Sequence, residues 1–230
     1  AAARAGHDRF IFTSTTSLMI SEQVRAGKSG GATEAFWLDE EYGPLKPRNI
    51  YGVTKLAAEH LCRLYSANHG LAVAILRTGR FFPEDDDTLE QPSGPNLKAN
   101  EFMNRRLTVE DAADAHIAAL DKVTGIGCET FILSAPPPFE RSEAVELMRN
   151  APAVIARKFP QVEELYRQRG WALPDIIERV YDPSKAERLL GFRCKTDFAA
   201  ILAALADGKP MPFQHDSSYI SPKEKSGALS

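Results

Sequence analysis

The stretch Tyr51-Gly52-Val53-Thr54-Lys55 lies downstream of an apolar run that ends in hydroxyl side chains, Phe10 to Thr15. The apolar run is typical of a buried parallel strand, and the spacing of residues 51–67 predicts a helix. Positions 51 and 55 share one face of that helix, so the Lys55 ammonium can approach the Tyr51 phenol. A cation ~4 Å away, at an effective dielectric of ~20, favours the phenolate by about 4 kcal/mol. Tyr51 is therefore a candidate proton acceptor.

Thr15 stands just past the end of the predicted strand. In open α/β sheets, ligands bind at the carboxyl ends of the strands, so this hydroxyl is a candidate partner for the substrate oxygen that gains or loses the proton. The Tyr-x-x-x-Lys spacing by itself is a weak signal. A tyrosine at a helix start and a solvated lysine are the structural alternative.

Strands and helices alternate along the rest of the chain, which predicts an α/β fold with a parallel sheet. Residues 17–48 carry several glycines and prolines, so we expect mostly loop and irregular structure there, and residues 82–100 contain three prolines beside an acidic run. Thr108 begins a capping pattern, and Asp182 and Gly191 have the residue types typical of a helix start and end. The predicted buried strands are 9–14, 71–76 and 130–134, and the predicted helices are 51–67, 108–120, 142–149, 161–169 and 182–191 with its caps.

The composition favours a globular protein of one or two domains, with 43% hydrophobic residues in 230. The net charge of -3 arises from 28 basic and 31 acidic residues mixed along the chain, which predicts neither a nucleic acid nor a membrane surface as partner. No apolar run reaches the ~18 residues of a membrane span. Three separated cysteines, without a Cys-x-x-Cys pair, predict reduced thiols in a cytoplasmic protein.

Three further features have an ordinary structural explanation. The five histidines show no metal-ligand spacing, and the acidic run 84–87 is typical of a solvated loop. The glycine-rich segment 27–31 is not a P-loop, because Glu22 stands where that motif needs glycine. Trp171 either packs in the C-terminal lobe or lines a substrate pocket.

Five motifs, in order along residues 9 to about 200, resemble the extended short-chain dehydrogenase/reductases. Within that group the chain is most similar to the NAD-dependent epimerase/dehydratase family. The motifs are Thr13-Ser14-Thr15, Asn49 to Glu59, Ile75-Leu76-Arg77, Val109 to His116, and Ser184 to Phe192.

The resemblance implies a Rossmann-type doubly wound parallel sheet and an oxidoreductase or isomerase that passes hydride between a substrate carbon and NAD or NADP, with NAD favoured. Tyr51 would be the acid/base, Lys55 would hold the nicotinamide ribose and favour the phenolate, and Thr15 would complete the triad. Ser14 and Thr78 would also contact the cofactor. The substrate would be a small molecule, for which a nucleotide sugar is one candidate, and the helix that carries Tyr51 would form a homodimer.

Substrate contacts are implied for Thr15, Arg80 and Arg105. Arg80 stands where nucleotide-sugar enzymes of the family tend to carry an asparagine, so it is either a partner for a phosphate or carboxylate or a structural ion-pair partner. Asn104, Arg105 and Arg106 stand near the family's diphosphate-binding arginine, and their register is left open.

The family's glycine-rich dinucleotide loop is not found in these 230 residues. We expect it, with the first strands of the sheet, to precede residue 1, because residues 1–6 resemble the last turn of a helix that ends at Gly6. These residues alone should then bind NAD(H) weakly.

We divide the chain into three parts: residues 1–83 with 108–134 as the C-terminal part of an NAD(P)-binding domain, residues 84–107 with 135–206 as a substrate lobe, and residues 207–230 as a flexible tail. The leading hypothesis is an epimerase, dehydratase or reductase. One alternative is a cofactor-sensing or scaffold protein of the same fold that does not turn over substrate. Another, compatible with the leading hypothesis, is a truncated product with little activity of its own.

Overall fold

The computed structural model describes residues 1–81 and 93–213. The acidic run 84–87 and most of the predicted tail lie outside these residues. The described elements, in chain order, are η1 (Ala3–Ala5), β1 (Arg9–Thr15), η2 (Thr16–Met19), α1 (Glu22–Ala26), η3 (Gly27–Gly30), β2 (Phe36–Leu38), α2 (Ile50–His69), β3 (Ala72–Thr78), α3 (Gly94–Glu101), α4 (Val109–Ile126), β4 (Cys128–Leu133), η5 (Arg141–Glu143), α5 (Ala144–Lys158), α6 (Val162–Arg169), β5 (Arg179–Tyr181), α7 (Ser184–Leu190) and α8 (Phe198–Ala206).

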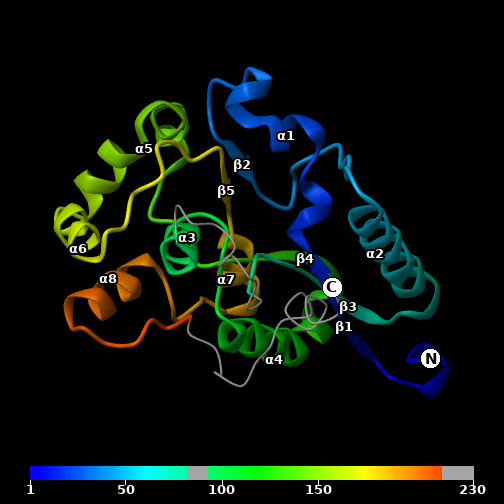
Figure 1. Cartoon of the computed structure of the whole chain (residues 1–230). Coiled ribbons are helices and arrows are strands. Elements are labelled where there is room, and N and C mark those ends of the chain that lie inside the picture. Colours follow the sequence, from blue (N-terminus) through cyan, green and yellow to red (C-terminus); the bar gives the residue numbers. More distant parts are fainter. Residues whose placement is uncertain (82–92, 214–230) are drawn as a thin grey trace, which may run out of the picture.

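A three-stranded parallel sheet of order β1-β3-β4 confirms the predicted α/β fold. The register aligns the strand ends, because Thr15 pairs with Thr78 and Thr78 with Leu133. Strand β3 is buried along its whole length, which explains its small and β-branched side chains. Helix α2 lies on one side of the sheet and α4 on the other (Figure 1).

Alternate side chains of β1 point to opposite faces of the sheet, as the period of a strand requires. The Ser14 hydroxyl reaches Glu59 on α2, whereas the Thr13 hydroxyl lies 2.7 Å from Nε2 of His116 on α4. Nδ1 of His116 lies 2.7 Å from the carbonyl oxygen of Ala112 and must donate to it. Nε2 of a neutral His116 is therefore the acceptor of the Thr13 proton.

A second group of helices, α3, α5, α6 and α8, gathers on the other side of the molecule from α2 (Figure 1). Their buried side chains form one cluster that includes Phe102, Leu147, Tyr166 and Phe198. The cluster also includes Ala35, which lies outside the predicted C-terminal lobe, so the division of the chain into lobes stays a prediction. Strand β5 pairs in parallel with β2, so Phe36 N donates to Glu178 O at 2.8 Å.

The prediction that residues 17–48 are mostly loop is partly wrong, and helix α3 within residues 82–100 was not predicted. Helix α1 forms because the Ser21 hydroxyl accepts from Val24 N and caps its first turn. Strand β2 has only three residues and depends on its pairing with β5, which local sequence does not reveal. Helix α3 begins at Gly94 and contributes buried residues, Ala99 and Glu101 among them, to the second half of the molecule.

The other predicted strands and helices are confirmed, several of them longer than expected. Helix α5 continues to Lys158 across a break at Asn150, where φ is -157° and ψ is 72°. The Asn150 carboxamide oxygen accepts from Ala153 N at 3.3 Å, so Asn150 caps the second part of the helix. Pro152 thus lies in a first turn, where its missing N–H costs little. Among the described residues no helix is long and apolar enough to cross a membrane.

Candidate functional site

Helix α2 begins close against the segment that follows β1. The Asn49 side chain accepts from Gly52 N at 2.8 Å and caps the helix. A Cβ on Gly52 would lie 2.7 Å from Pro47 Cβ and 3.4 Å from Leu18 Cα, so only glycine permits this close approach. The cap and the contact together place Tyr51 beside the end of β1.

Lys55 and Tyr51 come together on α2 as the spacing predicts. Lys55 Nζ donates to the carbonyl oxygen of Thr13 at 2.8 Å, which fixes the ammonium at the end of β1. The same atom lies 5.1 Å from the centroid of the Phe12 ring and 6.0 Å from that of the Tyr51 ring. Tyr51 is 47% exposed, so its phenol is accessible to a ligand. The cation therefore lies over the ring that it was predicted to influence.

The hydroxyls at the ends of β1 and β3 are buried and already hydrogen-bonded. Thr15 Oγ1 accepts from Ser17 N at 3.1 Å and caps η2, which leaves the Thr15 proton available for a further acceptor. Thr78 Oγ1 donates to Ser14 O at 3.1 Å. Ser14 Oγ donates inward to Glu59 at 2.7 Å, so its predicted contact with the cofactor stays a prediction.

Glu59 is a fully buried carboxylate one helical turn beyond Lys55. Besides Ser14, it accepts from Arg77 Nε at 2.9 Å, from Arg77 Nη2 at 2.8 Å and from Arg63 Nη2 at 3.2 Å. Burial by itself raises the pKa of Glu59, but Arg77, Ser14 and Arg63 together hold it below its ordinary value. Sequence reasoning quoted Glu59 and Arg77 only as parts of motifs, and missed that they join α2 to the sheet.

A second buried carboxylate, Glu101, receives three guanidinium groups. Its oxygens lie 2.7 Å from Arg80 Nη1, 2.6 Å from Arg105 Nη2 and 2.7 Å from Arg106 Nη1. Burial raises the pKa of Glu101, but Arg105, Arg80 and Arg106 hold it below its ordinary value. The structure thus contains the ion pair that was one alternative for Arg80. Substrate contacts by Arg80 and Arg105 stay predictions.

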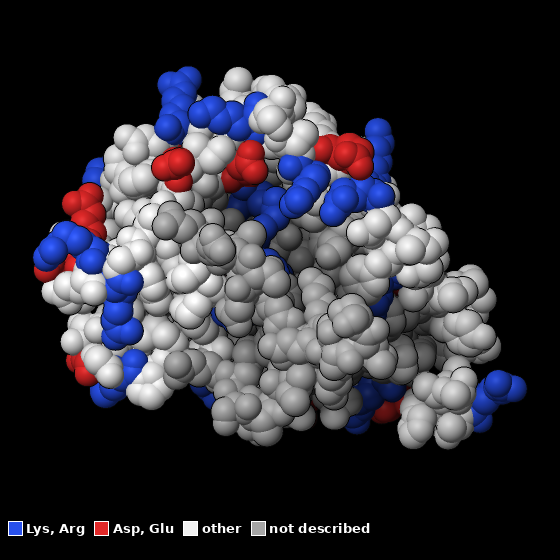
Figure 2. Space-filling view, in the orientation of Figure 1, with Lys and Arg blue, Asp and Glu red and all other residues white. Residues whose placement is uncertain are grey.

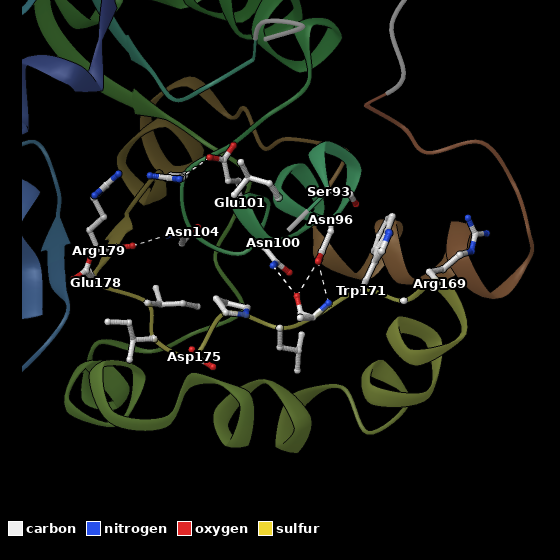
Figure 3. Close-up of a pocket in the computed structure, with 18 residues that line it drawn as sticks. Ser93, Asn96, Asn100, Glu101, Asn104, Arg169, Trp171, Asp175, Glu178 and Arg179 are labelled. Atoms are coloured by element: carbon white, nitrogen blue, oxygen red, sulfur yellow. Dashed lines mark hydrogen bonds and ion pairs between the residues drawn. The ribbon is translucent and has the colours of Figure 1, made fainter. Parts of the chain in front are cut away.

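A cavity of about 690 Å³ lies between α3 and the segment 169–179 (Figure 3). Arg179 and Asn104 mark one end of it, and Trp171 and Arg169 the other. Tyr51, Lys55 and Thr15 are not among the residues that line the cavity.

Two asparagines of α3 fix the far wall of this cavity. Asn96 accepts from Ala172 N at 2.9 Å and donates to Ala172 O at 3.0 Å. Asn100 also donates to Ala172 O, at 3.0 Å. The neighbouring Trp171 lines the cavity and packs edge-on against Tyr166, with the ring centroids 5.5 Å apart. The packing role of Trp171 is therefore confirmed, whereas a contact of Trp171 with substrate stays a prediction.

Within residues 1–81 and 93–213, no group of three or more His, Cys, Asp or Glu side chains could hold a metal ion. Cys62, Cys128 and Cys194 are free thiols.

The comparisons with known proteins support the predicted resemblance. Residues 1–94 match the model of the NAD dependent epimerase/dehydratase family. UDP-glucose 4-epimerase 2 of Oryza sativa subsp. japonica is 25% identical over 223 residues, an alignment that covers 83% of this chain and 50% of that protein. The chain therefore spans about half the length of this curated relative.

Solved structures of sugar-nucleotide 4-epimerases share the fold of this chain. UDP-N-acetylglucosamine 4-epimerase from Bacillus cereus has a TM-score of 0.52 at 22% identity, covering 86% of this chain and 61% of that one. UDP-glucuronic acid 4-epimerase from Bacillus cereus, in complex with UDP-glucuronic acid and NAD, has a TM-score of 0.52 at 19% identity, covering 90% and 62%. Residues 1–94 are thus similar in sequence to the NAD dependent epimerase/dehydratase family, and the solved structures share the fold of this chain.

Proposed function

We propose that this chain carries the proton-handling residues of an NAD(P)-dependent epimerase, dehydratase or reductase, with Tyr51 as the acid/base and NAD as the favoured cofactor. The observation that carries the proposal is the position of Lys55, which donates to Thr13 O at 2.8 Å while its ammonium lies over the Tyr51 ring. The match to a family described as NAD-dependent supports the choice of cofactor.

The residues present fit a nicotinamide ribose beside α2. Lys55 has three N–H donors and the carbonyl of Thr13 takes one, so the others can bond ribose hydroxyls. Tyr51 is exposed on the same face of the helix. When bound, the cofactor would supply hydride transfer.

Tyr51 would then take the proton of a substrate hydroxyl, or return it to a carbonyl oxygen. Lys55 would hold the cofactor beside the Tyr51 ring, because its ammonium is fixed by Thr13 O and lies 6.0 Å from the ring centroid. The Thr15 proton can bond the same substrate oxygen, since the Ser17 N–H already occupies one Thr15 lone pair. Tyr51 and Thr15 would hold that oxygen between them.

We infer that the substrate lobe consists of residues 84–107 and 135–206, as the sequence predicts, and that the cavity beside α3 holds part of a small-molecule substrate. A nucleotide sugar is the favoured class, because the rice relative is named as a UDP-glucose 4-epimerase. The cavity volume of about 690 Å³ is within the range usual for small-molecule sites.

The test is interconversion of UDP-glucose and UDP-galactose by the 230-residue chain with millimolar NAD, followed by NMR. We expect Tyr51→Phe to lower the rate by about 10²-fold or more, because the proton acceptor is lost. The matched control is Tyr65→Phe, since Tyr65 is a half-exposed tyrosine of the same helix and should leave the rate unchanged.

Binding of NADH, followed by its fluorescence, separates the two hypotheses. Lys55→Met should weaken NADH binding about tenfold through the loss of a charge-assisted hydrogen bond. Turnover that survives Tyr51→Phe would remove Tyr51 from the mechanism. Lys55-dependent NADH binding without turnover of any sugar nucleotide would favour the cofactor-sensing alternative.

A further inference from the structure

We propose that Arg179, together with Arg105, forms a subsite for an anionic oxygen group, either a carboxylate or a phosphoryl group, at one end of the cavity beside α3. The inference builds on the proposed function, since the group would belong to the substrate. Neither the family resemblance nor the sequence patterns gave Arg179 a role.

The position of Arg179 is fixed by its backbone. It lies in β5 opposite Phe36 of β2, and its carbonyl oxygen accepts from Asn104 Nδ2 at 2.9 Å. The side chain lines the cavity, and Nε is buried without a hydrogen-bond partner among the described residues. A buried donor without a partner is costly, and more so when it carries charge. A ligand oxygen in the cavity would satisfy it.

Two carboxylates that line the same cavity, those of Glu178 and Glu101, are engaged elsewhere. Glu178 points away from it (Figure 3), lies against Gly27 and accepts from Lys28 N at 2.8 Å. Glu101 divides its two oxygens among three guanidinium groups, that of Arg105 included. This end of the cavity therefore has an excess of positive charge.

Basic side chains also gather around a hollow on this face, over α1 and β5 (Figure 2). Burial lowers the pKa of Arg179, and repulsion from Arg105 and Arg25 lowers it further, while the interaction with the Tyr181 side chain raises it in part. The guanidinium nevertheless remains charged in proteins, so the repulsion persists until an anion enters. A planar guanidinium with a free Nε suits the two parallel hydrogen bonds that a carboxylate or a phosphate accepts.

Calorimetric titration of the 230-residue chain with three probes tests the subsite and distinguishes the two sources of the oxygens. The probes are UDP-glucuronic acid, UDP-glucose and inorganic pyrophosphate. The first two differ only in the carboxylate at the sugar C6. The variants are Arg179→Gln, which removes the charge, and Arg179→Lys, which retains the charge but lacks Nε. Arg188→Gln is the control, because it removes one exposed positive charge from α7.

If a sugar carboxylate occupies the subsite, Arg179→Gln should lower the affinity for UDP-glucuronic acid about tenfold and leave the affinity for UDP-glucose unchanged. If a phosphoryl group occupies the subsite, the same substitution should lower the affinity for all three probes about tenfold. In either case the Arg179→Lys variant should bind the affected probes with intermediate affinity. That result would also show that the fold survives substitution at residue 179. The Arg188→Gln variant should bind every probe with the affinity of the wild type.

The subsite is refuted if Arg179→Gln binds every probe as the wild type does, or if the wild type binds none of them. The proposed function fails differently. In that case sugar nucleotides are not turned over, although the binding of an anionic probe still depends on Arg179.

Discussion

At the scale of the residue, Glu59 shows how the candidate catalytic helix is fixed to the sheet. Its carboxylate accepts hydrogen bonds from Ser14 of β1, Arg63 of α2 and Arg77 of β3. Breaking a buried ion pair by removal of one partner is strongly destabilising, because the remaining charge keeps its desolvation cost. Glu59 therefore affects the position of Lys55 without touching substrate.

We expect Glu59→Gln to lower the free energy of unfolding by about 3 kcal/mol at neutral pH. The substitution keeps the shape of the side chain but leaves Arg77 without its counter-charge. Urea denaturation measures the loss. Glu129→Gln, which breaks the more exposed pair with Lys185, should cost about 1 kcal/mol or less. Equal effects of the two substitutions would contradict a special role for the buried carboxylate.

The same residue predicts how stability depends on pH. The pKa of Glu59 is lower in the folded protein than in the unfolded chain, where it is about 4.3. The stabilisation is therefore fully present above pH ~4.3 and is lost as the pH falls through the folded pKa. Urea titrations between neutral pH and pH ~3 should show this loss, and its acid slope should be smaller in Glu59→Gln. An unchanged slope would assign the acid sensitivity to other carboxylates.

At the scale of the element, the start of α2 depends on the absence of a side chain at residue 52. We expect Gly52→Ala to destabilise the protein by about 1–3 kcal/mol, because the new methyl would lie 2.7 Å from Pro47 Cβ. Gly125→Ala in α4 is the control, since its Cβ would meet nothing within 4 Å. That change should stabilise by about 0.5–1 kcal/mol. Thermal unfolding should shift in opposite directions, and a common direction would show that the contact at Gly52 is unimportant.

Local sequence predicted those elements that carry their own signals. Buried strands such as β3, and helices with clear caps such as α4, follow from periodicity and capping residues. Strands β2 and β5 could not be predicted, because three residues have no detectable period and each strand depends on the other, far away in the chain. The helix predicted for residues 142–149 was too short, because α5 breaks at Asn150 and then continues to Lys158.

The candidate site was predictable only in part, for a similar reason. Tyr51 and Lys55 have a motif with a mechanism, whereas Arg179 is one arginine in a short strand without any pattern. Its importance arises from Asn104, Glu101 and Glu178, which the fold brings near it or turns away from it.

At the scale of the whole molecule, Glu101 connects the sheet to the second group of helices. It belongs to α3, and its partners Arg80 and Arg106 belong to segments that follow β3 and precede α4. We expect Glu101→Gln to increase hydrogen exchange in α3 and β5 more than in β1 and β3, since three guanidinium groups would lose their counter-charge. Mass spectrometry of peptic fragments measures this, and uniform exchange across the sheet and these helices would show that the connection is not local.

The register of β1 has a consequence for how this protein can change during evolution. The Ser14 hydroxyl hydrogen-bonds Glu59 on one face of the sheet, and the Thr13 hydroxyl hydrogen-bonds His116 on the other. Thr15 caps the turn that follows β1. Because the side chains of a strand alternate, the insertion or deletion of a single residue would exchange these partners at once. Relatives of this chain should therefore vary β1 by substitution and confine their differences in length to the loops.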